Sequence, residues 1–387
     1  MMLVKNKIGF YTATALVIAN MIGTGVFTSL GFQTALLPSV TVVLLLWLCG
    51  GVIAICGGLS YVELARLFPG SGGEYHYISN TYSINAAKIV GLVSIIAGFS
   101  GPVALAGIAL GAHVGQLYPH INVKLIAFCA ISFVTLFHCF NLKIASGFQL
   151  LSTTLKLLLI VIFIICGYFS SVNYLDLSFR ETDQKLLISK GFLSSLVYVS
   201  FAYSGWNASI YIFNEIDRPV KNIKKSIVWG TLIVTVLYIF LNVIFLKVIP
   251  LANTTGVIEI GALAASSIFG TIGGKIASAI ISLLLVSTIS AMVWTGPRVI
   301  DAMLPRLKKK PVPLHAVIIQ YGITVLLLFT GTFEHILSYT GVALSLSSCV
   351  AVSILFFKHK AVSKLSLLIA LIYIFATLWS CYYLIFM

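Results

Sequence analysis

The sequence predicts an all-α integral membrane protein with about eleven transmembrane helices. The chain of 387 residues is 59% hydrophobic and only 9% charged, and its mean hydropathy is +1.07, values that a soluble domain of this size does not reach. Its apolar residues gather into stretches of roughly 20, the length that crosses a bilayer as a helix. Two of these stretches also contain an interruption that a simple membrane anchor does not need.

Short polar loops separate the apolar stretches. We place the spans at about 8–30, 39–66, 86–117, 124–141, 149–170, 190–213, 226–249, 273–297, 314–332, 335–357 and 364–386. Most of the 24 Lys and Arg residues fall in alternate loops, Arg306 and Lys308 to Lys310 among them. Because such loops stay on the cytoplasmic side, we expect a multi-pass protein of the bacterial cytoplasmic (inner) membrane with its N-terminus in the cytoplasm.

The same loops account for the net charge of +14. Basic residues spread over short loops between apolar spans indicate membrane topology rather than nucleic-acid binding. We therefore expect a lipid bilayer as the surroundings of the chain and no nucleic acid as a partner.

The first ten spans divide into two groups of five, which run in opposite directions across the membrane. The groups cover residues 8–170 and 190–357, and their similar length fits an inverted-topology repeat. We predict a first five-helix repeat in residues 1–170, a second, inverted repeat in 190–357, and an additional C-terminal transmembrane helix in 358–387.

The first span has a weak point at Ile22-Gly23-Thr24-Gly25-Val26-Phe27. Glycine destabilises a helix, and broken backbone at membrane depth persists only where it lines a cavity or is buried in protein. The free amides of a half-helix attract a carboxylate. The segment predicts a binding site; the alternative is that its small residues let helices pack closely.

The sixth span has a matching weak point at Phe201-Ala202-Tyr203-Ser204-Gly205-Trp206-Asn207. It lies at the start of the second half, as the first weak point lies at the start of the first half. Paired interruptions at corresponding positions of two halves indicate a transporter binding site.

A lone charged residue, Lys156, lies within the fifth span. A buried ammonium needs an oxygen partner or deprotonation, so we predict that Lys156 meets carbonyls freed by the first break, as a fixed cation or as a proton carrier. The alternative is a side chain that reaches the cytoplasmic interface. Ser287, Thr288 and Ser290 of the eighth span either face this site or bond to their own helix.

Enzymatic chemistry has no support in the sequence. It shows no Ser/His/Asp set, no paired acids, no phosphate-binding loop and no metal-ligand spacing, and its seven cysteines lie in apolar spans as packing residues. We expect no catalytic residues, no metal and no cofactor.

Four motifs lie in order on or beside the predicted spans. They are Ile22 to Phe27; Tyr61 with Glu63-Leu64, Pro69, Ser71-Gly72-Gly73-Glu74-Tyr75 and Tyr77; Phe201 to Asn207 with Asn214-Glu215 and Pro219 to Ile223; and Gly296-Pro297-Arg298-Val299 with Ala302-Met303. Together they resemble the amino acid–polyamine–organocation superfamily, and within it the L-type amino acid transporter-like branch, over residues 5–357.

The resemblance implies a leucine-transporter-type fold of five plus five inverted helices, with spans one and six unwound. It implies that Gly23, Thr24 and Gly25 bind the α-carboxylate of an amino acid. Carbonyls around both breaks would bind its α-amino group, and the matching positions are Ile22, Phe201, Ala202 and Ser204, with Tyr203 beside them.

The resemblance also assigns a gate and a coupling site. Phe201 is the expected aromatic gate, and Trp206 is the second candidate. Lys156 matches the lysine that makes many members sodium-independent, with Ser287 and Thr288 expected beside it. Ser204 stands where many relatives have glycine, which would narrow the side-chain pocket.

The implied function is sodium-independent transport of neutral amino acids by alternating access and exchange. We expect no acidic residue near either break, which argues against a polyamine or dibasic substrate. The alternatives are a proton-coupled symporter, with Lys156 as the proton carrier, and a transport-inactive membrane sensor or structural protein. The outer loop from Tyr118 to Val123 has no cysteine, so no disulfide-linked partner subunit is expected; the oligomeric state is left open.

Overall fold

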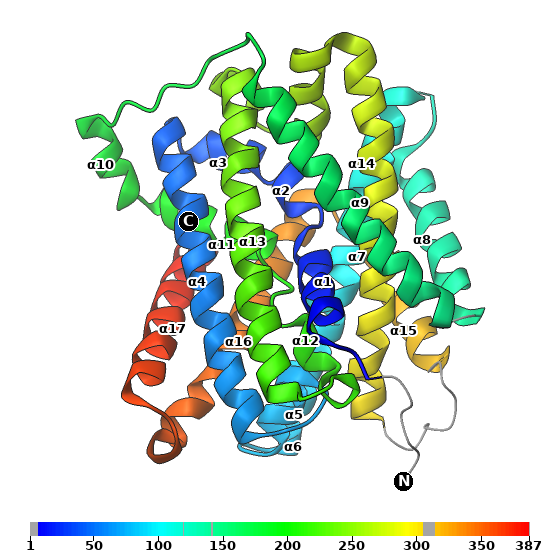
Figure 1. Cartoon of the computed structure of the whole chain (residues 1–387), viewed down its shortest axis with the longest axis vertical. Helices are drawn as coiled ribbons and strands as arrows, with labels where there is room; N and C mark the ends of the chain where they lie inside the picture. Colours follow the sequence, from blue (N-terminus) through cyan, green and yellow to red (C-terminus); the bar gives the residue numbers. More distant parts are fainter. Residues whose placement is uncertain (1–6, 119, 141, 305–313, 387) are drawn as a thin grey trace.

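The protein is a bundle of helices, most of which run along the long axis of the molecule (Figure 1). The computed structural model describes residues 7–118, 120–140, 142–304 and 314–386, with the backbone alone for 142–150 and for residues 140 and 152. The predicted basic loop with Arg306 and Lys308 to Lys310 lies outside these ranges. The all-helical prediction is confirmed.

The first half of the chain begins with a broken helix. Its elements are α1 (Phe10–Met21), α2 (Gly25–Thr28), α3 (Leu30–Leu36), α4 (Val40–Leu67), α5 (Gly73–Ser79), α6 (Ile84–Val93), the π-helix η1 (Ser94–Ser100), α7 (Gly101–Leu117), α8 (Val123–Phe140) and α9 (Leu142–Tyr168).

The second half also begins with a broken helix. Its elements are α10 (Glu181–Leu187), α11 (Lys190–Ala202), α12 (Ala208–Tyr211), η2 (Phe213–Glu215), α13 (Pro219–Val248), η3 (Leu251–Thr254), α14 (Ile260–Met303), α15 (Leu314–Thr330), α16 (Phe333–Phe357), η5 (His359–Ala361) and α17 (Lys364–Ile385). Helix α14 starts well before the predicted residue 273 and bends at Gly270, whose φ is 75°.

Length and apolar composition identify the helices that can cross a membrane. In the described ranges seven helices qualify, the bent pair Glu181–Leu187 and Lys190–Ala202 would make an eighth, and three shorter apolar helices accompany them. Each of the eleven predicted spans coincides with one of these helices, and the number that cross a bilayer stays a prediction.

Local sequence explains where several helices begin. The hydroxyls of Ser39, Ser83 and Ser363 each accept a hydrogen bond from a backbone amide in the first turn of α4, α6 and α17. Such caps satisfy amides that have no partner within the helix. Pro219 opens α13, where a missing amide hydrogen costs nothing.

Small residues let the central helices approach closely. A Cβ on Gly230 of α13 would lie 2.6 Å from Cγ1 of Val17 in α1, and a Cβ on Gly107 of α7 would lie 2.6 Å from Cδ1 of Ile131 in α8. Close backbone approach of this kind is how membrane helices pack without a hydrophobic driving force. It holds the broken first span between α13, α9 and α14, in the interior of the bundle.

Candidate functional site

The first span is interrupted where its glycines lie. Helix α1 ends at Met21 and α2 starts at Gly25, and residues 22–24 between them are not helical. The amide of Gly23 bonds the carbonyl of Met21 at 2.8 Å, a tight turn that stops the regular helical pattern. The carbonyl of Ile22 and the first amides of α2 therefore have no partner inside a regular helix.

The sixth span is interrupted over Tyr203 to Asn207, between α11 and α12. Gly205 has a φ of 103°, and a Cβ there would lie 2.7 Å from the carbonyl carbon of Asn20. Only glycine suits both the left-handed conformation and the close approach. The second interruption thus packs directly on the end of α1.

The two interruptions contact each other. A Cβ on Gly25 would lie 2.5 Å from Cα of Ala202, so the broken segments pack backbone to backbone. The hydroxyl of Tyr238, from α13, lies 2.6 Å from the carbonyl oxygen of Met21 and 3.1 Å from that of Ala202. One phenol therefore connects the ends of α1 and α11.

Lys156 lies at the same place. Its side chain is 1% exposed, and its ammonium donates to the carbonyl of Ile22 at 2.8 Å and to the hydroxyl of Thr288 at 3.0 Å. The structure thus brings Lys156 to a carbonyl at the first interruption, in the interior of the protein. Its role in coupling stays a prediction.

The hydroxyls of the eighth span divide among three environments. Thr288 lies against Lys156 and also donates to the carbonyl of Leu284 in its own helix at 3.3 Å, so both alternatives hold for it. Ser290 lies 2.8 Å from Nε2 of His138. The buried hydroxyl of Ser287 has no hydrogen-bond partner among the residues that the structure describes.

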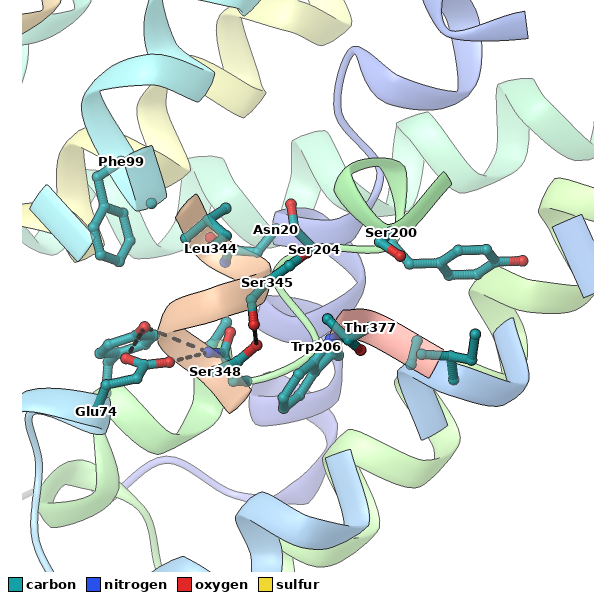
Figure 2. A pocket seen from close by; sticks show the side chains of 18 of the residues that line it. Asn20, Glu74, Phe99, Ser200, Ser204, Trp206, Leu344, Ser345, Ser348 and Thr377 are labelled. Atoms are coloured by element: carbon teal, nitrogen blue, oxygen red, sulfur yellow. Dashed lines mark hydrogen bonds between the residues drawn. The ribbon is translucent and has the colours of Figure 1, made fainter. Parts of the chain in front are cut away.

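A cavity lies beside the two interruptions (Figure 2). Three of the predicted site residues line it: Tyr203, Ser204 and Trp206. The other lining residues are Asn20, Gly50, Ile53, Ala54, Glu74, Gly98, Phe99, Ser200, Gly205, Asn207, Ala208, Tyr211, Met292, Thr295, Leu344, Ser345, Ser348, Tyr373 and Thr377. Gly98 and Phe99 belong to the π-helix η1, an irregularity that often accompanies functional sites.

The remaining predicted residues, Ile22, Gly23, Thr24, Gly25, Phe201 and Ala202 among them, do not line this cavity. Gly25 and Ala202 form the contact between the two interruptions, whereas a Cβ on Gly23 would lie 3.3 Å from Cγ2 of Thr288.

The two gate candidates have different surroundings. Phe201 is 6% exposed and packs in the apolar cluster that includes Tyr198 and Leu337. Trp206 faces the cavity and meets the ring of Tyr61 edge-on, with centroids 4.8 Å apart. The structure therefore puts the second candidate at the cavity wall, and the gate assignment stays a prediction.

The expectation that no acidic residue lies near either interruption is wrong. The carboxylate of Glu74, on α5, accepts a hydrogen bond from the side-chain amide of Asn207 at 3.0 Å and lines the cavity. The two residues are 133 positions apart. Their contact therefore depends on the tertiary packing of α5 against the second interruption.

Sequence reasoning also missed Tyr238. The only signal for it was a phenol in the middle of an apolar span, a position where the hydroxyl needs a partner. Glu74 gave a weaker signal, because it lies between two predicted spans, where a carboxylate is normally solvated.

The bundle has two broken spans, placed at the start of two successive halves and connected through Tyr238, with a buried lysine against the first. This arrangement defines a membrane transporter rather than an enzyme. The comparisons identify it further. A family model described as amino acid permease matches residues 8–387, and the chain belongs to this family. The predicted membership of the amino acid–polyamine–organocation superfamily, in its L-type branch, is confirmed.

Several characterised relatives are similar to the chain. The serine/threonine exchanger SteT of Bacillus subtilis is 30% identical over 312 residues, which are 78% of this chain and 69% of SteT. The large neutral amino acids transporter small subunit 2 of Rattus norvegicus is 26% identical over 87% of this chain and 67% of its own. The human b(0,+)-type amino acid transporter 1 is 29% identical over 63% of this chain but only 52% of its own.

A solved structure supports the fold. The nucleobase–cation symporter MHP1, in a closed conformation with bromovinylhydantoin bound, matches with a TM-score of 0.57 at 14% identity, over 93% of this chain and 81% of that one. At this identity the likeness concerns the fold alone. It confirms the predicted leucine-transporter-type fold.

Proposed function

We propose that the protein transports amino acids across the cytoplasmic membrane, without sodium, by alternating access and exchange. The observation that carries this proposal is the contact of Lys156 with the carbonyl of Ile22 at 2.8 Å. A fixed ammonium at the broken helix supplies the positive charge that a bound cation would otherwise supply to freed carbonyls.

We assign the substrate to the junction of the two interruptions. The amides of Gly23, Thr24 and Gly25 would bind its carboxylate. Carbonyls of Ile22, Phe201, Ala202 and Ser204 would bind its ammonium, with Tyr203 beside them. Substrate entry requires the Gly25–Ala202 contact to loosen, which fits a transporter that binds in one conformation and closes in another.

A neutral side chain fits the cavity better than a charged one. The cavity offers apolar and hydroxyl groups such as Ile53, Leu344 and Ser345, and its carboxylate, Glu74, already accepts three hydrogen bonds from the protein. The relatives include a serine/threonine exchanger and a transporter of large neutral amino acids, which supports the same class.

Uptake into proteoliposomes tests the proposal. A panel of labelled neutral and dibasic amino acids is offered in sodium-free buffer, with and without amino acid inside the vesicles. Uptake of neutral amino acids that requires internal amino acid is the expected result. Folded protein that moves no amino acid would instead support the sensor or structural alternative.

Proton symport is the second candidate. Among the described residues the ammonium of Lys156 donates to two neutral oxygens and to no carboxylate. Loss of its proton would therefore leave no buried negative charge without a cation. Uptake driven by an inward proton gradient into vesicles without internal amino acid would favour this mechanism over exchange.

A further inference from the structure

Glu74 is a buried carboxylate in the wall of the cavity. Its side chain is 4% exposed, and none of the four ion pairs found in the described part of the chain includes it. A carboxylate without a cation is stable in such a place only if hydrogen bonds replace its hydration.

Three donors satisfy this carboxylate. The hydroxyl of Tyr61 donates to Oε1 at 2.8 Å. The amide of Asn207 donates to Oε1 at 3.0 Å and the hydroxyl of Tyr211 donates to Oε2 at 2.6 Å, and Figure 2 shows the Glu74 carboxylate with dashed lines at these contacts. An ionised carboxylate is an acceptor only, so the arrangement matches its charged form. Hydrogen bonds to a charged acceptor are roughly twice as strong as neutral ones.

The donors belong to parts of the molecule that are separate in sequence. Tyr61 lies on α4, near Glu74 in the first half. Asn207 directly precedes α12 in the second half, and Tyr211 is the last residue of that helix. Glu74 therefore joins the second half of the broken sixth span to the first half of the protein.

The loop before α5 is built for this contact. Gly73 has a φ of 55°, and a Cβ there would overlap the ring of Tyr211. A side chain at this position would be strained and would push Tyr211 away. A second hydrogen bond connects this loop to the second half of the chain: the hydroxyl of Ser71 accepts from the backbone amide of Asn214 at 3.0 Å.

We propose that Glu74 is a positioning residue of the transport site, whose carboxylate holds Asn207 and Tyr211 against α4 and α5 and so keeps the predicted cytoplasmic end of the cavity closed. This inference rests on the proposed transport function. Opening of the cavity toward the cytoplasm then requires α12 to separate from the Glu74 carboxylate. The strength of the hydrogen bonds to this carboxylate sets the equilibrium between the closed and the open conformation.

A reporter cysteine in the cavity tests the inference. Ser345 lines the cavity, so Ser345→Cys is labelled with a charged, membrane-impermeant thiol reagent added from the cytoplasmic side of vesicles. Each variant is also measured without the reporter, which corrects for the seven native cysteines. The labelling rate does not depend on transport, so the test stands even if the uptake experiment fails.

Glu74→Gln should raise the labelling rate about tenfold, because losing one hydrogen bond to a charged group shifts a two-state equilibrium by about that factor. Tyr211→Phe should do the same, and the double variant should label no faster than the faster single one. Glu74→Asp, which keeps the carboxylate, should label more slowly than Glu74→Gln. Glu63→Gln is the matched control, since Glu63 is a more exposed carboxylate paired with Arg66 on α4.

Two results would overturn the proposal. One is a labelling rate in Glu74→Gln equal to that of the parent protein. The other is a double variant whose rate is the product of the two single effects, because independent effects exclude a shared contact. If Glu74→Gln does not yield folded protein, Tyr211→Phe decides alone by the same criterion, since it keeps the ring against Phe99 at a centroid distance of 5.5 Å.

Discussion

The ammonium of Lys156 donates a hydrogen bond to the carbonyl of Ile22, although the two residues are 134 positions apart and both are buried. The carbonyl is available because α1 ends one residue earlier, at Met21. The lysine can stay buried because that carbonyl and the hydroxyl of Thr288 replace water around it. Each feature therefore explains the other.

Replacing Lys156 with methionine tests this relationship. The variant keeps the shape of the side chain and removes the charge, and we expect initial amino acid uptake to fall at least about tenfold, since a hydrogen bond to a charged group is lost at the broken helix. Lys275→Met is the control, because Lys275 is exposed on α14. Uptake at the parental rate, with the same pH dependence, would exclude a coupling role for Lys156.

The contact between the two interruptions gives a second prediction. Gly25→Val places a branched side chain where a Cβ alone would lie 2.5 Å from Cα of Ala202. Overpacking of this kind costs about 1–3 kcal/mol, so we expect a lower melting temperature and loss of substrate-induced stabilisation. The control is Gly322→Ala, since nothing lies within 4 Å of a Cβ there. Parental affinity in Gly25→Val would contradict the assigned binding site.

Tyr238 gives a third prediction. Tyr238→Phe removes one hydroxyl and leaves the carbonyl of Ala202 without that donor, whereas the carbonyl of Met21 still accepts from the amide of Gly23. Unsatisfied buried groups cost about 1–3 kcal/mol, so thermal unfolding should occur at a lower temperature and uptake should slow. Tyr339→Phe, at a tyrosine that is 74% exposed, should change neither. An unaltered melting curve for Tyr238→Phe would mean that the phenol does not hold the two helix ends together.

Local chemistry explains which of these features could be predicted from sequence. Glycines disfavour a helix wherever they stand, so the interruptions near Gly23 and Gly205 were predictable. A lone charge in an apolar span needs a polar partner, which made Lys156 conspicuous. The apolar stretches likewise located most helices to within a few residues. The exceptions begin earlier than predicted: α9 at 142 instead of 149, α13 at 219 instead of 226, and α14 at 260 instead of 273.

The features that could not be predicted are contacts between residues that are far apart in the sequence. Tyr238 reaches Met21 across 217 positions, and Glu74 reaches Tyr211 across 137. Nothing in the local sequence of either residue encodes its partner. The π-helix over Ser94–Ser100 has a similar origin, since its residues have no propensity that distinguishes it from the α-helices on both sides.

Lys247 gives a prediction about stability rather than transport. Its ammonium donates to the carbonyls of Gly167, Tyr168 and Ser170 at 3.0, 2.6 and 3.0 Å, and so caps the end of α9 from α13. A cation at a helix C-terminus contributes about 0.3–2 kcal/mol, and Lys247→Met should lower the melting temperature by a few degrees. Because the residue lies away from both interruptions, the KM for uptake should not change. A shift in KM with no change in melting temperature would assign Lys247 to the transport cycle instead of to the end of α9.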